Sequence, residues 1–177
     1  MLRVAAAGRV IPAAALLVFV TAERLAELWL ARRNTMALLA RGAREAAPEH
    51  YPLIVALHML WLAGLWGLGW HAAVDAGWLA VFAALQGLRW WVLATLGRRW
   101  TTRIIVLPGT SLVTTGPYRF MTHPNYAVVV GEIAVVPLSL GLAWYALAFS
   151  VANAAVLAIR IRAENAALSG GRDATGA

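Results

Sequence analysis

The sequence predicts an all-α integral membrane protein with about five transmembrane helices. Of its 177 residues, 62% are hydrophobic, and the mean hydropathy is +0.70. A soluble domain averages only about 45–50% apolar residues. Runs of about the length needed to cross a bilayer recur along the chain. The predicted spans are residues 10–31, 51–70, 78–96, 124–140 and 145–162. We expect one domain over residues 1–168 and a disordered, glycine-rich tail over 169–177.

Composition excludes several classes of site. All basic residues are arginines, and the net charge is +7. These arginines cluster beside apolar segments, so membrane orientation explains them better than nucleic-acid binding, and no nucleic-acid partner is predicted. The absence of cysteine excludes disulfides, thiolate metal sites and cysteine nucleophiles. Four scattered histidines form no His-x-x-x-His pair, so no metal site is predicted.

The first predicted span, residues 10–31, follows a short basic N-terminus. Its polar residues Glu23, Arg24 and Glu27 continue on a helical pattern, and the two glutamates are four apart on one face. This pattern favours a span with a charged inner end. A removable signal peptide is the alternative, because basic and apolar regions precede small residues near Thr21.

A polar loop is expected over residues 32–50, closed by Pro48. The second span, residues 51–70, has His58 as its one strongly polar side chain. A lone histidine in such a position is more often packed and hydrogen-bonded than a ligand. We therefore interpret His58 as structural.

The third span, residues 78–96, is interrupted by Gln86 and Arg89 on one helical face. An arginine in mid-membrane costs roughly 2.5–3.5 kcal/mol on insertion scales, so it needs a partner or a wet cavity. Glu23 or Glu27 of the first span is the candidate partner. A structural ion pair is favoured over a catalytic role for Arg89.

The segment 97–123 is too polar to span a membrane and too apolar to be a free tail, so we expect a cap on the membrane face. It contains a β-prone stretch at residues 104–106. The spans 124–140 and 145–162 then form a C-terminal hairpin, because residues 141–144 allow a tight reversal.

Charge predicts the orientation of the chain. Most arginines lie in the loop 32–50, the segment 97–123 and the C-terminal end, whereas the turns 71–77 and 141–144 contain none. The positive-inside rule places the arginine-rich side in the cytoplasm.

The stretch from Gly116 to Tyr126 concentrates polar residues within this apolar chain. Gly116 and Pro117 indicate a turn. His123 precedes Pro124, which disfavours helical backbone at the histidine and suits the first position of a helix. His123 is therefore expected at the start of a helix with Tyr126 on its first turn. The alternative is a polar loop that happens to contain a histidine.

Arg160 and Glu164 are four residues apart and share one helical face. The predicted hairpin returns this end of the last span to the level of His123 and Tyr126. We expect these four side chains and Tyr118 to line one pocket. The alternative is a surface ion pair worth a few tenths of a kcal/mol.

Together these motifs resemble the C-terminal signature of the isoprenylcysteine carboxyl methyltransferase family, most closely its small bacterial five-span members. The family methylates an acidic oxygen of a lipid-like substrate with S-adenosylmethionine. The resemblance implies that Arg160 holds the substrate anion and that His123 takes part in catalysis. It implies cofactor contacts from Thr110, Ser111, Leu112, Val113, Tyr118, His123, Pro124, Asn125, Tyr126 and Glu164.

The expectation is thus an S-adenosylmethionine-dependent O-methyltransferase of the bacterial plasma membrane, with its active site facing the cytoplasm. Its acceptor would be a lipid-like or prenylated carboxylate or phenol, met among membrane lipids. Two positions depart from the family pattern, Thr122 in place of arginine and Asn165 in place of a second acid. The alternatives are an NADPH-dependent reductase of the sterol-reductase type, which has a similar motif, and a non-enzymatic membrane scaffold.

Overall fold

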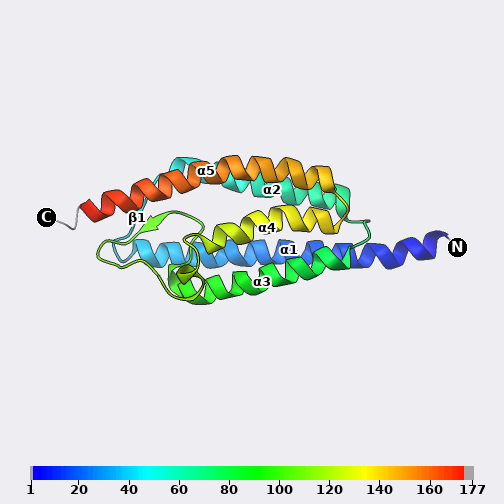
Figure 1. Cartoon of the computed structure of the whole chain (residues 1–177), viewed down its shortest axis with the longest axis horizontal. Coiled ribbons are helices and arrows are strands. Elements are labelled where there is room, and N and C mark those ends of the chain that lie inside the picture. The colour runs from blue at the N-terminus through cyan, green and yellow to red at the C-terminus, as the bar shows by residue number, and fades with distance from the viewer. Residues whose placement is uncertain (1, 174–177) are drawn as a thin grey trace.

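The structure is a computed structural model that describes the backbone of residues 2–173 and the side chains of residues 13–164 and 166. Within this range five α-helices run side by side along the long axis of the molecule (Figure 1). They are α1 (Leu2–Leu39), α2 (Tyr51–Gly69), α3 (Ala76–Leu96), α4 (Pro124–Ser139) and α5 (Ala143–Asp173). The connections contain η1 (Pro48–His50), β1 (Arg44–Glu45), η2 (Gly97–Arg99), β2 (Ile105–Val106) and η3 (Gly116–Arg119).

Three described helical stretches are long and apolar enough to cross a membrane: Pro48–Gly69, Ala76–Arg99 and Ala143–Glu164. The helix α4 is apolar but has only 16 residues, or about 24 Å at 1.5 Å per residue. A hydrocarbon core is about 30 Å thick. The predicted mostly helical architecture is therefore confirmed, and three of the described helices, rather than the five predicted, have the length and composition expected of a membrane span.

The predicted boundary after the first span is wrong, because α1 continues to Leu39 and the expected loop 32–50 begins late. Asn34 is buried, and its side-chain amide donates to the carbonyls of Gly97 at 3.1 Å and Trp100 at 2.8 Å. A polar residue typical of loops is thus satisfied inside a helix by carbonyls from another segment.

The last helix also extends beyond its predicted end. A tail was expected from residue 169, but α5 is helical through Asp173. Alanines and a leucine precede the glycines there, and adding a residue to an existing helix is far easier than starting one. Residues 174–177 of the predicted tail lie outside the described residues.

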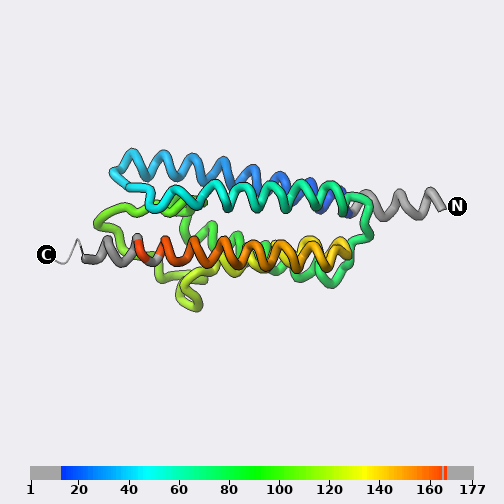
Figure 2. The backbone as a smooth tube through the Cα atoms, turned by 90° about the horizontal axis from the view of Figure 1, so that it is seen from above, coloured from blue at the N-terminus to red at the C-terminus, as the bar shows by residue number. Residues whose placement is uncertain are grey.

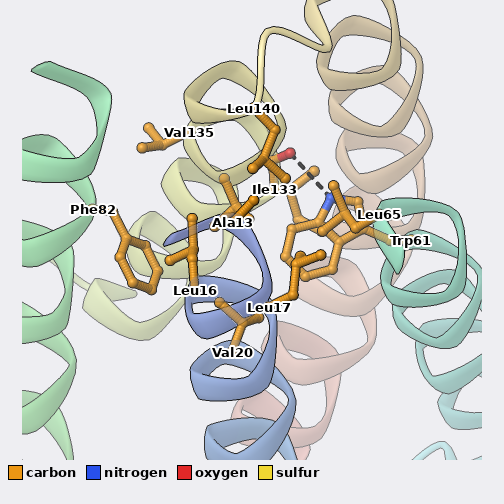
Figure 3. Packing of buried hydrophobic residues seen from close by; sticks show 11 residues of the cluster. Ala13, Leu16, Leu17, Val20, Trp61, Leu65, Phe82, Ile133, Val135 and Leu140 are labelled. Atoms are coloured by element: carbon orange, nitrogen blue, oxygen red, sulfur yellow. Dashed lines mark hydrogen bonds between the residues drawn. The ribbon is translucent and has the colours of Figure 1, made fainter. Parts of the chain in front are cut away.

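Apolar side chains from α1, α2, α3 and α4 form the main core (Figure 3). Pro137, inside α4, has no N–H to donate to the carbonyl of Ile133 one turn earlier. The indole nitrogen of Trp61 on α2 donates to that carbonyl at 3.3 Å. A partner helix therefore satisfies the backbone group that the proline leaves free.

A buried arginine links three helices. Arg89 of α3 is 2% exposed and pairs with Glu27 of α1 and Glu132 of α4. Its Nε donates to Glu132 Oε1 at 2.9 Å and lies 3.7 Å from Glu23 Oε1. The expected partner Glu27 is confirmed, while Glu132 is a partner that the sequence analysis did not identify.

Two further polar side chains complete this cluster. Arg24 contacts Glu132 at 2.6 Å and Glu27 at 2.9 Å, and Gln86 donates to Glu132 at 2.8 Å. Three carboxylates thus share two guanidinium groups inside the bundle. Because buried charges are costly unless paired, this network ties α1 to α3 and α4.

The segment 97–123 lies at the end of the bundle where α1 and α5 also end (Figures 1 and 2). Its strand β2 lies within the β-prone stretch 104–106 and pairs antiparallel with β1, a partner that was not predicted. Arg103 adds an ion pair to Glu45 at 2.8 Å and lies over the ring of Tyr51 at 4.4 Å. These contacts fix the segment against the start of α2.

Candidate active site

Two glycines shape the segment that leads into the candidate site. Gly97, with φ +50°, ends α3, and Gly116, with φ +58°, begins η3. A Cβ at Gly116 would lie only 2.4 Å from Thr95 Oγ1. Gly116 is thus required both for its left-handed backbone and for its close approach to α3.

His123 lies immediately before α4, as predicted. Pro124 occupies the first turn, and the amide of Tyr126 donates to the His123 carbonyl at 3.1 Å. The His123 and Tyr126 rings stack with centroids 5.0 Å apart and planes 18° apart. The local sequence therefore holds both rings at the start of the helix.

The end of α5 supplies the expected charged pair. Tyr126 Oη donates to Glu164, and Arg160 Nε donates to Tyr126 Oη at 2.8 Å. The Arg160 guanidinium also lies over the Tyr126 ring, 5.6 Å from its centroid. His123 Nδ1 lies 4.0 Å from Glu164 Oε2. The predicted convergence of these four side chains is present.

These side chains line a cavity of about 430 Å³ between the segment 97–123 and the ends of α4 and α5. Its size is within the range of small-molecule sites, roughly 300–1,000 Å³. The predicted residues that line it are Thr110, Ser111, Leu112, Val113, Tyr118, His123, Asn125, Tyr126, Arg160 and Glu164. Pro124 instead is buried in α4, where it starts the helix rather than lining the cavity.

Tyr118 is a protonated phenol at neutral pH. Burial, and to a lesser degree the Glu164 carboxylate, raises the pKa of Tyr118 to about 12. It can therefore donate a hydrogen bond to a ligand but is not a phenolate base.

Several lining residues were not predicted, among them the polar or aromatic side chains of Arg99, Trp100 and Arg103. The arginines were treated only as orientation charges. Arg99 Nη1 donates to the Ser111 carbonyl at 2.9 Å, which holds the lining segment to the end of α3. The clustering of arginines in a segment outside the predicted spans was the signal that could have identified Arg99 and Arg103 as lining residues.

A second cavity, of about 150 Å³, adjoins the first and extends among the helices. Trp100, Thr101, Asn125, Tyr126 and Arg160 line both cavities. Apolar side chains make up much of the remaining wall of the second cavity: Leu28, Ile54, Val55, Met59, Leu62, Val129, Val156 and Leu157. The larger cavity and a smaller, more apolar one therefore meet at the start of α4.

Comparison with known protein families identifies the family of this chain. The model of the isoprenylcysteine carboxyl methyltransferase family matches residues 78–170, more than half of the chain. This chain belongs to that family. The match contains Tyr118, Tyr126, Arg160 and Glu164, and it confirms the resemblance seen in the sequence. Isoprenylcysteine carboxyl methyltransferases use S-adenosylmethionine and act on prenylated substrates in membranes.

Two bacterial relatives span nearly the same length. The uncharacterized protein YpbQ of Bacillus subtilis is 40% identical over 158 residues, covering 86% of this chain and 94% of the relative. An uncharacterized protein of Haemophilus influenzae is 24% identical over 157 residues, covering 85% of this chain and 91% of the relative. No solved structure matches the chain significantly.

Of the two positions that depart from the family pattern, the structure describes the side chain of one. Thr122, which replaces the usual arginine, is exposed and lines the larger cavity. The side chain of Asn165 lies outside the described residues. An isoprenylcysteine carboxyl methyltransferase fold therefore forms the larger cavity here without an arginine next to His123.

Proposed function

We propose that the protein is an S-adenosylmethionine-dependent O-methyltransferase that acts on a carboxylate or phenolic oxygen of a lipid-like acceptor at the membrane surface. The observation that carries this proposal is the junction of the two cavities. Asn125 and Trp100 line both cavities, and Asn125 Oδ1 and Trp100 Nε1 are buried without a hydrogen-bond partner among the described residues. A polar acceptor group at the junction would satisfy them.

The larger cavity suits S-adenosylmethionine. Among the described residues that line it, Glu164 is the one carboxylate, and the cofactor carries a sulfonium and an ammonium. Glu164 would bind the ammonium or the ribose hydroxyls. The stacked rings of His123 and Tyr126, with Tyr118, would hold the adenine and its polar edges. When bound, the cofactor supplies an electrophilic methyl group.

Arg160 is the residue proposed to bind the acceptor. Arg160 lines both cavities, whereas Glu164 lines the larger one alone. Its Nε is occupied by Tyr126, which leaves the two terminal nitrogens for a bidentate contact with an anion. A carboxylate or phenolate held there needs only alignment and exclusion of water. For a neutral phenol, His123 is the candidate base.

The same arrangement suggests how the two ligands arrive. The arginine-rich end of the bundle would face the cytoplasm of a bacterium, and a soluble cofactor would enter there. A lipid-like acceptor would reach the apolar cavity laterally through the plasma membrane. Methyl transfer would then take place at the membrane surface.

A labelling experiment tests the proposal. Purified protein is incubated with methyl-labelled S-adenosylmethionine and a lipid extract of a bacterial membrane. Label is expected in the organic phase with the wild type and not with Glu164→Gln. A wild-type protein that transfers no label but is stabilised by NADPH would contradict the proposal and favour a reductase.

A further inference from the structure

The smaller cavity contains a buried amide that lacks a partner. Asn153 of α5 is 4% exposed and lines this cavity. Its side chain makes no hydrogen bond to any residue that the structure describes. A carboxamide carries two donor hydrogens and an accepting oxygen, and one that faces a cavity can offer both to a ligand. A ligand group in the cavity would supply the missing partner.

His58 of α2 lines the same cavity and has one nitrogen free. Its Nδ1 lies 2.8 Å from the Ile54 carbonyl oxygen. A carbonyl can only accept, so Nδ1 carries the proton. In the neutral imidazole Nε2 is then a hydrogen-bond acceptor. No described residue donates to it.

The charged residues of this cavity are paired with one another, although Arg24 Nε is buried without a partner among the described residues. Arg24, Glu27 and Arg89 also line it, but they pair with one another and with Glu132. Trp100 Nε1 and Asn125 Oδ1 are also unpaired among the described residues, but both belong to the junction with the larger cavity. On the walls that α2 and α5 contribute, the uncharged side chains with an unpaired polar atom among the described residues are the histidine and the amide. Both are uncharged, so the group that fits them is neutral.

Asn153 lies well away from the proposed methylation point. Asn153 precedes Arg160 by seven residues, or about 10 Å along the axis of α5. Val156 and Leu157, which lie between them on this helix, line the cavity and are apolar. A ligand that reaches from Arg160 to Asn153 would thus pass an apolar wall before meeting a polar pair.

We propose that Asn153 and His58 form a subsite for a hydroxyl group on the acceptor chain, about 10 Å from the oxygen that is methylated. This inference rests on the proposed function, because it takes the smaller cavity as the acceptor site. A hydroxyl can donate to His58 Nε2 and accept from the Asn153 amide. An alkyl chain would leave both side chains unpaired, and a carbonyl would leave His58 without a donor.

Two probes of equal size test the subsite. ω-Hydroxyoctanoate and nonanoate differ by a hydroxyl in place of a methyl group, and this end lies about 10 Å from the carboxylate in an extended chain. Their affinities are measured by competition in nanodiscs containing the wild type or Asn153→Leu. The ratio of affinities, hydroxy acid over nonanoate, is expected to fall about tenfold in the variant. His58→Phe should lower the same ratio, and this variant provides the test if Asn153→Leu does not fold.

Val156→Leu is the matched control, because it changes the apolar wall of the same cavity on the same helix. It should change both affinities together and leave the ratio as in the wild type. Equal ratios in the wild type, Asn153→Leu and His58→Phe would overturn the subsite, as would failure of both probes to bind the wild type.

Unfolding with and without S-adenosylmethionine in the same samples separates the two proposals. A cofactor shift with an unchanged probe ratio would remove the subsite and leave the methyltransferase proposal standing. A changed ratio without any cofactor shift would keep a hydroxyl-selective lipid site and remove the methyl donor.

Discussion

At the residue scale, Tyr126 connects the two proposed ligands. Its hydroxyl donates to Glu164 and accepts from Arg160, and its ring stacks on His123. One phenol thus holds both the carboxylate assigned to the cofactor and the guanidinium assigned to the acceptor. Substitutions at the two charged partners should separate their roles.

Arg160→Ala should leave cofactor affinity nearly unchanged and lower kcat/KM for the acceptor by about 10–100-fold. A hydrogen bond to a charged group contributes roughly 1.5–3 kcal/mol, which corresponds to this range. Steady-state kinetics with varied acceptor measure the effect. Arg162→Ala is the control, because Arg162 is exposed on the same helix and lines neither cavity. Loss of cofactor binding in Arg160→Ala would show that the two roles are reversed.

Tyr118 should titrate late. Its pKa is raised to about 12, above the ordinary value of 10.0, so the folded state holds the proton more tightly than the unfolded chain. The stability it contributes is therefore complete below pH 10 and is lost as the pH rises toward 12. Comparing the ultraviolet titration of the wild type with that of Tyr118→Phe isolates this group. A Tyr118 transition near pH 10 would contradict its burial.

At the element scale, the charge cluster around Arg89 should hold α1 against α3 and α4. Arg89→Met leaves Glu27 and Glu132 without their shared partner, and breaking a buried pair in this way costs about 3–5 kcal/mol. Denaturant unfolding in detergent measures the loss. The partly exposed pair of Arg103 and Glu45 provides the control, because Arg103→Met should cost at most about 1 kcal/mol. Equal losses would mean that the cluster does not link the helices.

Features set by neighbouring residues in the chain could be predicted, whereas contacts between distant segments could not. Proline at the start of α4 and the four-residue spacing of Arg160 and Glu164 are local patterns, so the sequence alone placed both correctly. Glu132 was not identified as a partner of Arg89, because nothing near it in the chain shows which helix it faces. The end of α1 was misplaced for a similar reason, since the groups that satisfy Asn34 come from a segment far along the chain.

The candidate site was predictable where its residues follow a local motif. The family motif identified most of the residues that line the larger cavity. The second cavity and the unpaired Asn153 could not be seen, because they depend on how α2, α4 and α5 pack together. Arg99 was overlooked because an arginine outside a span has an adequate explanation in membrane orientation.

At the scale of the whole molecule, the arginine-rich end should face the cytoplasm. The chain has no cysteine, so a single introduced thiol reports on one position. Ala73→Cys, in the turn after α2, should react with a membrane-impermeant maleimide on intact cells. Arg98→Cys, at the opposite end of α3, should react only after the cells are permeabilised. The reverse pattern would invert the proposed orientation.

The most direct test of the central claim is the thermal unfolding of detergent-purified protein with and without S-adenosylmethionine. A ligand at about 100 times its Kd adds roughly 2.7 kcal/mol to the free energy of unfolding, which gives a readable rise in Tm. We predict this rise for the wild type and its loss in Glu164→Gln, because the carboxylate lines the larger cavity. No rise in the wild type, or an equal rise in the variant, would contradict a cofactor site built around Glu164.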